Sequence, residues 1–219
     1  MSVDSWSPED HIRHFMYESI GATLSSLVWD KPHYRVLDFA SKWYGDPDGG
    51  WRTHLRSMLK VILGGQDRFE HVLGEFPEYN IEGMPAVPEG EFDIVIADQV
   101  LEHVERPWLG AREILRVLKS GGITVVATPG LYPIHQSPVD CWRIMPDGYK
   151  VLFPEASFEW LNFGMWGNQE RVGFEYAHNG GFPNGPPSTN VEQAMAQPYY
   201  VDGSDGRCPL QIWFVGRKR

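Results

Sequence analysis

The fold is decided by residues 91–128, which read EFDIVIADQVLEHVERPWLGAREILRVLKSGGITVVAT. Phe92–Ala97 is a continuous apolar run, as expected for a strand that is covered on both faces of a sheet. Pro107 suits the first turn of a helix, which we expect to end at residues 120–122, where glycine can adopt the left-handed cap. Ile123–Ala127 is expected to form the next strand. A strand, a helix and a strand joined by short loops predict a right-handed crossover and a parallel sheet.

Working outward from this unit, short apolar runs bounded by turn residues predict further strands. They are expected over Tyr34–Ala40, Val61–Leu63, Phe158–Phe163 and Leu210–Val215. A helix is expected from Pro8 onward, with a second over about Trp51–Leu59. The last two strands are separated by a long loop and are expected to form an antiparallel pair at one edge of the sheet. We therefore predict an α/β fold with a doubly wound, mostly parallel sheet and an antiparallel edge hairpin.

Length, composition and charge favour a globular protein and disfavour several other classes of protein. The chain has 219 residues, of which 42% are hydrophobic and 22% charged, as in an ordinary single globular domain. Its formal net charge of −10 disfavours a nucleic-acid partner, because phosphates would be repelled. The apolar runs are too short to span a bilayer, and the N-terminal residues lack the pattern of a signal peptide. Cys141 and Cys208 form no disulfide framework, so we expect a cytoplasmic protein without a membrane partner.

The same stretch resembles a known family. Phe92–Val104 is similar to the strand motif FDxVxxxxVLEHV of the class I S-adenosylmethionine-dependent methyltransferases. Glu113–Gly122 is similar to the helix that ends in LKPGG there, with Ser120 where proline is usual. Tyr34–Ala40 resembles the family's first strand, VLDxG, and Asn80–Pro85 the segment before its fourth strand. The resemblance covers roughly residues 35–128. Residues 133–148 are similar to one bacterial branch of the same methyltransferase family.

This resemblance implies a Rossmann-like fold, S-adenosylmethionine as cofactor and S-adenosylhomocysteine as product. It implies methyl transfer, which we expect to act on a small molecule such as a sugar or a natural product. Residues 1–219 would then be one domain, with a helical cap over 1–30 and a cofactor-binding core over 31–128. Residues 129–219 would supply loops on the acceptor side and the closing strands. The oligomeric state is left open.

Two positions depart from the family pattern. The first loop usually reads GxGxG, and here Ala40, Lys42 and Tyr44 stand in place of the three glycines. The acid that usually ends the second strand is replaced by Gly64 or Gly65. These departures leave open an alternative, in which the protein keeps the fold but acts as a binding or regulatory module. A third possibility is a reaction other than methyl transfer on the same fold.

The resemblance implies a set of cofactor-binding residues at the ends of the strands. They are Asp38, Ala40, Ser41, Asn80, Ile81, Asp98 and Gln99. Open α/β sheets bind ligands at the carboxyl ends of their strands, so the pocket is expected where the strands end near Ala40 and Ala97. The alternative for Asp38 is a carboxylate that caps a turn. For Asn80 and Ile81 the alternative is an ordinary turn before a strand.

Three residues are candidates for the acceptor side, namely His103, His135 and Arg143. A histidine can take a proton near neutral pH, and an arginine can hold a carboxylate or a phosphate. Methyl transfer needs alignment and, for some acceptors, a base, so no metal is expected. The alternatives are a His103 bonded to a nearby carbonyl and an Arg143 paired with Asp140 or Asp147.

The bulky residues of the first loop lead to a prediction. Lys42 and Tyr44 are expected to weaken cofactor binding, because glycine lets the backbone approach a ligand closely. Replacing both by glycine should therefore lower the dissociation constant of S-adenosylhomocysteine in a calorimetric titration. An unchanged constant would show that close backbone approach does not matter in this protein.

Overall fold

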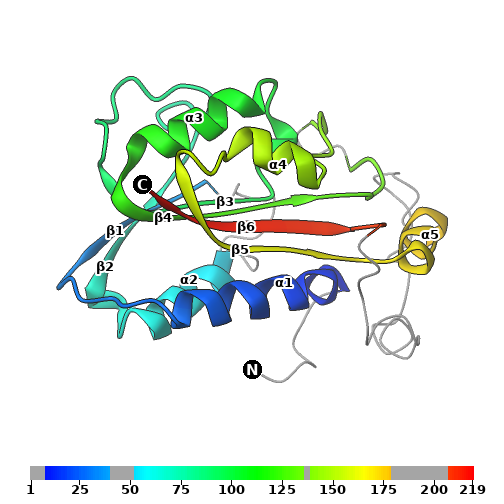
Figure 1. The fold of residues 1–219 in the computed structure, drawn as a ribbon, viewed down its shortest axis with the longest axis horizontal. Coiled ribbons are helices and arrows are strands. Elements are labelled where there is room, and N and C mark those ends of the chain that lie inside the picture. The colour runs from blue at the N-terminus through cyan, green and yellow to red at the C-terminus, as the bar shows by residue number, and fades with distance from the viewer. Residues whose placement is uncertain (1–7, 40–51, 136–138, 179–206) are drawn as a thin grey trace.

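The computed structural model describes residues 8–39, 52–135, 139–178 and 207–219, and within them six strands form one sheet (Figure 1). The strands are β1 Tyr34–Asp38, β2 Phe69–Leu73, β3 Phe92–Asp98, β4 Leu118–Pro129, β5 Phe158–Trp166 and β6 Gln211–Lys218. The helices are α1 Pro8–Ser25, α2 Arg52–Ile62, α3 Pro107–Val117, α4 Pro146–Leu152 and α5 Gln169–His178. Two short 3₁₀ helices cover Gln66–Arg68 and Leu101–His103.

The sheet has the strand order β2-β1-β3-β4-β6-β5. The first four strands in this order, β2, β1, β3 and β4, are parallel to one another. Strand β6 runs antiparallel to both β4 and β5. The predicted α/β class, with its mostly parallel sheet and antiparallel edge pair, is therefore confirmed. The order reverses between β1 and β3, which makes that point the place where sheets of this kind bind ligands.

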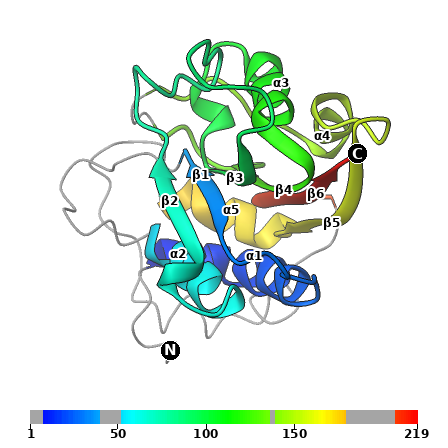
Figure 2. The same cartoon turned by 90° about the vertical axis from the view of Figure 1, so that its left-hand side faces the viewer.

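Helices cover both faces of the sheet. In Figure 1, α1 and α2 lie on one side and α3 and α4 on the other, and Figure 2 shows the same three layers from the end. On β3, Ile94 belongs to the core under α1 and α2, while Val95 belongs to the core under α3 and α4. Both side chains are fully buried, which explains the continuous apolar run. Among the described residues, no helix is long and apolar enough to cross a membrane.

The strand predicted over Val61–Leu63 is wrong, because α2 continues through Ile62. Leu59 and Leu63 are buried, whereas Val61 between them is 80% exposed, which is helical rather than strand spacing. The two glycines that follow, Gly64 and Gly65, have positive φ angles and end the helix. The second strand of the sheet is β2, which begins six residues after Leu63.

The end of α3 also differs from the prediction. The helix ends at Val117, and Leu118 already has an extended backbone and pairs with Phe92 of β3. Gly121 has a φ of 75°, so the left-handed conformation occurs where it was expected, but within the irregular start of β4. Pairing with β3 therefore takes the chain out of the helix before the glycines are reached.

Asp93 ties the start of β3 to its surroundings. Its carboxylate is 5% exposed and accepts hydrogen bonds from Lys31 (2.6 Å), Lys119 (2.8 Å) and the backbone N–H of Arg35 (2.9 Å). Burial raises the pKa of Asp93, but the bonds from Lys119, Lys31 and Arg35 outweigh it, and the pKa lies below 3.8. The folded state therefore favours the ionised carboxylate.

Asp93→Asn is expected to lower the free energy of unfolding at neutral pH by about 1–3 kcal/mol, since a charged hydrogen-bond acceptor is lost. A lowered pKa contributes stability above the unfolded pKa and loses it as the pH falls through the folded pKa. The difference between wild type and variant should thus shrink as the pH falls below 3.8. Urea unfolding at several pH values measures it, and a difference independent of pH would contradict this explanation.

Candidate functional site

Two carboxylates lie where the strand order reverses. Asp38 and Asp98 are the last residues of the neighbouring parallel strands β1 and β3, so both lie at the carboxyl edge of the sheet. Asp38 is 1% exposed, and its Oδ2 lies 3.1 Å from Nε2 of His71 on β2. Burial raises the pKa of Asp98, and the nearby charge of Asp38 adds to this effect. This edge concentrates negative charge in a largely buried place.

Helix α1 contributes to the same edge. The hydroxyl of Tyr17 donates a 2.8 Å hydrogen bond to Oδ2 of Asp98. The charge of Arg13, one turn earlier, lowers the pKa of Asp98 and of Glu102, against the larger effect of burial on each. The sequence indicated only an apolar face for this helix, and nothing in its spacing pointed to a strand end far along the chain.

In the structure, the predicted cofactor residues Asn80, Ile81 and Gln99 all contact other parts of the protein. Oδ1 of Asn80 accepts the backbone N–H of Glu82 at 3.0 Å, as in an ordinary Asx turn. Ile81 is 4% exposed and packs in the core under α3 and α4. Gln99 has a φ of 55°, and its Nε2 donates to Oε1 of Gln211 on β6 at 3.0 Å.

Ala40 and Ser41 lie outside the described residues, as do Lys42 and Tyr44. Their roles, and those of Asn80, Ile81 and Gln99 toward a cofactor, stay predictions.

The corrected position of β2 changes the search for an acid after the second strand. Because β2 ends at Leu73, Gly64 and Gly65 lie before this strand and not after it. The first carboxylate after its end is Glu75, an exposed residue two positions beyond Leu73. Gly74 donates its N–H to the carbonyl of Asp38 at 2.7 Å, which holds this turn beside the end of β1. Sequence reasoning missed Glu75 because it assigned the strand to the end of α2.

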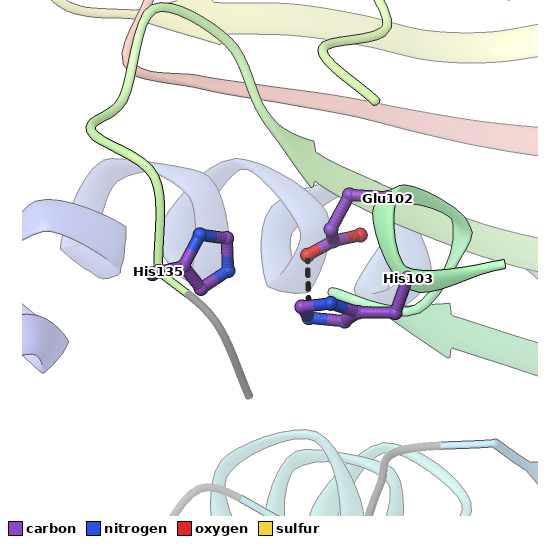
Figure 3. Close-up of side chains that lie close together, drawn as sticks. All are labelled: Glu102, His103 and His135. Atoms are coloured by element: carbon purple, nitrogen blue, oxygen red, sulfur yellow. Dashed lines mark ion pairs between the residues drawn. The ribbon is translucent and has the colours of Figure 1, made fainter. Parts of the chain in front are cut away.

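A second group lies beyond the ends of β3 and β4. Glu102, His103 and His135 lie close together, as Figure 3 shows. One ligand atom from each lies within 4.8 Å of the others. Nε2 of His103 is 3.6 Å from Oε1 of Glu102, and the two imidazole rings are 5.1 Å apart between their centres. The predicted residues His103 and His135 are thus neighbours, and Glu102 joins them.

The carboxyl group of Glu102 is fully buried, and neither oxygen has a hydrogen-bond partner among the described residues. Burial raises the pKa of Glu102 to about 8. Its backbone carbonyl accepts the N–H groups of Cys141 and Trp142, which ties this residue to the loop that carries His135. The sequence showed an acid beside His103, but burial without a partner is a property of the folded chain alone.

Each imidazole has an oxygen acceptor beside its Nδ1. Nδ1 of His103 contacts the backbone carbonyl of Val139, as the alternative reading of this residue expected. Nδ1 of His135 lies 3.1 Å from Oδ2 of Asp140, and the backbone N–H of His135 donates to the same oxygen at 2.9 Å. Burial lowers the pKa of His135 although the charge of Asp140 raises it, so the neutral imidazole is favoured.

The hydrogen bonds of Arg143 stay within its own loop. Its guanidinium pairs with both oxygens of Asp140 and donates to the backbone carbonyls of Tyr132, Pro133 and Trp142. These contacts use all five of its N–H donors. The pairing of Arg143 with Asp140 that the alternative expected is therefore present, and a role of Arg143 toward an acceptor stays a prediction.

Comparison with known proteins agrees with the resemblance seen in the sequence. The sequence model of a methyltransferase domain family matches residues 63–126, which run from the end of α2 into β4. No curated protein sequence matches the chain. The family match supports an enzyme of the methyltransferase class that uses S-adenosylmethionine.

A solved structure with a TM-score above 0.5 shares the fold at low sequence identity. A chain of the complex between the Haloferax volcanii Trm112 methyltransferase activator and a methyltransferase is 14% identical, with a TM-score of 0.53. The alignment covers 95% of this chain and 92% of that chain. An S-adenosylmethionine-dependent methyltransferase from Archaeoglobus fulgidus is also 14% identical, with a TM-score of 0.49 and coverage of 94% and 97%. The resemblance to the class I S-adenosylmethionine-dependent methyltransferases is thereby confirmed, by the family match over residues 63–126 and by the fold.

Proposed function

We propose that this protein transfers the methyl group of S-adenosylmethionine to a small-molecule acceptor in the cytoplasm. The observation that carries the proposal is the adjacency of two groups at one edge of the sheet. Asp38 and Asp98 lie at the strand-order reversal, and Glu102, His103 and His135 follow directly beyond β3 and β4. A ligand that spans both groups would present its reactive end to the histidines.

The residues at the reversal fit the cofactor. S-adenosylmethionine carries an ammonium group and two ribose hydroxyls, all hydrogen-bond donors, and Asp38, Asp98 and Glu75 offer carboxylate acceptors at the ends of β1, β3 and β2. We assign the ammonium group to the first two and the ribose hydroxyls to Glu75. When bound, the cofactor supplies an activated methyl group on its sulfonium.

The histidine cluster supports a role on the acceptor side. Burial favours a neutral His135, and a neutral imidazole accepts a proton or a hydrogen bond from an acceptor hydroxyl. Asp140 and Arg143 fix the position of its loop, which reduces the freedom lost when the acceptor binds. The net charge of −10 favours a small acceptor over a nucleic acid.

A transfer assay tests the proposal. The full chain is incubated with methyl-labelled S-adenosylmethionine and a metabolite extract, which is then separated into small molecules and macromolecules. Label in the small-molecule fraction, absent with boiled protein, is the expected result. Label in protein or nucleic acid would contradict the small acceptor. Tight binding of S-adenosylhomocysteine without any transfer would favour the binding or regulatory module instead.

A further inference from the structure

We propose that Glu102, His103 and His135 form a binding site for a divalent transition-metal ion, with zinc as the ion that best fits these ligands. Two imidazoles and one carboxylate form a ligand set that zinc takes in catalytic sites, where a further position stays open for a small molecule. No metal-ligand spacing was visible in the sequence, because Glu102 and His103 lie on a 3₁₀ helix and His135 on a loop about 30 residues later.

The distances allow one ion to contact all three side chains. Metal–ligand bonds of about 2.0–2.2 Å in a tetrahedron set two ligand atoms roughly 3.3–3.6 Å apart. Nε2 of His103 and Oε1 of Glu102 are already 3.6 Å apart. The third ligand atom lies within 4.8 Å of these, so a small side-chain movement of His135 completes the set. Figure 3 shows a ring nitrogen of His135 turned toward the other two side chains.

The oxygen atoms beside Nδ1 of His103 and of His135 favour a tautomer in which Nε2 of each ring is free to bind a metal ion. A carbonyl or a carboxylate oxygen only accepts hydrogen bonds, so it favours the tautomer with the proton on the nitrogen beside it. Val139 supplies such an oxygen next to Nδ1 of His103, whose Nε2 then carries the free lone pair. Oδ2 of Asp140 lies 3.1 Å from Nδ1 of His135 without the geometry of a hydrogen bond, and its negative charge still favours the proton on this nitrogen. Metal-binding histidines are held by backbone carbonyls and carboxylates in this way.

The carboxyl group of Glu102 is an independent observation that points to a ligand. It is 0% exposed, and both of its oxygens lack a hydrogen-bond partner among the described residues. A buried polar group without a partner costs roughly 1–3 kcal/mol, and more when it is charged. A cation between Glu102 and the two imidazoles would satisfy this carboxylate. Such a cation would give the burial of Glu102 a physical reason.

The proposed metal site also indicates the chemical class of the methyl acceptor. This inference rests on the proposed function. With the ion bound, Nε2 of His135 is a ligand and takes no proton from the acceptor. The ion instead lowers the pKa of an oxygen bound at its open position. An acceptor hydroxyl bound there would lose its proton to water, and its oxygen would form the new O–CH₃ bond while the S–CH₃ bond breaks. The products are a methyl ether and S-adenosylhomocysteine. We therefore infer that the acceptor is an alcohol or a phenol.

Metal binding is tested without any methyl acceptor. The chelator-treated full chain is titrated calorimetrically with Zn²⁺, and in parallel with Co²⁺ while its visible absorption is followed. We expect a high-affinity Zn²⁺ site that is absent or at least about tenfold weaker in Glu102→Gln and in His135→Ala. His33→Ala and Glu105→Gln, which change exposed residues, should bind Zn²⁺ as wild type does. Melting temperatures and far-UV circular dichroism check that each variant folds.

The Co²⁺ spectrum of the wild type keeps the test valid if a variant fails to fold. Absorption bands typical of nitrogen and oxygen ligands, displaced by Zn²⁺, support the site. Their absence, or a Zn²⁺ affinity in both ligand variants that equals that of the wild type, would overturn it. A chelator should then stop transfer to hydroxyl acceptors while the affinity for S-adenosylhomocysteine stays unchanged. Transfer to an amine that ignores the chelator would overturn the acceptor class, and loss of S-adenosylhomocysteine binding itself would instead count against the proposed function.

Discussion

Replacing His135 by alanine is expected to lower the turnover of the methyl acceptor about a hundredfold to ten-thousandfold. The imidazole contacts His103 ring to ring and lies beside Glu102, at the point where the acceptor side of the edge begins. Its loss removes a ligand of the proposed metal ion or, without a metal, the imidazole that takes the acceptor's proton. Steady-state kinetics measure this once a labelled product has identified the acceptor.

The affinity for S-adenosylhomocysteine serves as the internal control in this experiment. It should change little in His135→Ala, because the cofactor is assigned to the ends of β1, β2 and β3. His33→Ala changes an exposed histidine far along the chain from the site and should keep wild-type turnover. If His135→Ala and His103→Ala both turn over like wild type, the acceptor binds somewhere other than this cluster.

Phe214→Ala is expected to lower the free energy of unfolding by about 3–5 kcal/mol. Phe214 lies on β6 in the middle of the antiparallel part of the sheet and is fully buried. Its ring stacks on Phe153 with 5.0 Å between centres and contacts the rings of Phe158 and Trp160. Truncation removes these contacts and leaves a cavity between β6 and the segment that follows α4.

Urea unfolding measures the effect of this truncation. Val151→Ala on α4 is a suitable control, because Val151 is 79% exposed and a surface change of this kind alters stability by roughly 0.5 kcal/mol or less. Equal losses in the two variants would contradict the packing of Phe214 against Phe153.

The strands of the sheet were largely predictable, and one short apolar run was not. The side chains of Phe92–Ala97 alternate between two buried faces of the sheet. From the sequence, such an apolar run is either a central strand or part of a buried helix, and its short length favours the strand. Val61–Leu63 has the same composition but is too short for length to decide. Its burial pattern follows from packing against α1, which the sequence does not display.

The candidate site was predictable in part, at the strand ends and at the two histidines His103 and His135. Asp38 and Asp98 were named from the family resemblance and from the rule that parallel strands end at one edge of a sheet, and the structure places both at that edge. Tyr17, Glu75 and Glu102 were not found. Each depends on a tertiary contact or on a strand boundary, and their local sequence is that of an ordinary helix face, turn or loop.

The central claim is that S-adenosylmethionine binds at the ends of β1 and β3. Calorimetric titration of the full chain with S-adenosylhomocysteine tests it most directly. We predict one-to-one binding in the micromolar range, weakened about tenfold or more in Asp38→Asn, since a charged hydrogen bond is lost. Asp147→Asn, which changes an acid that is 91% exposed and paired with Lys150, should bind as wild type does. No heat of binding in the wild type, or equal affinity in Asp38→Asn and Asp147→Asn, would contradict the claim.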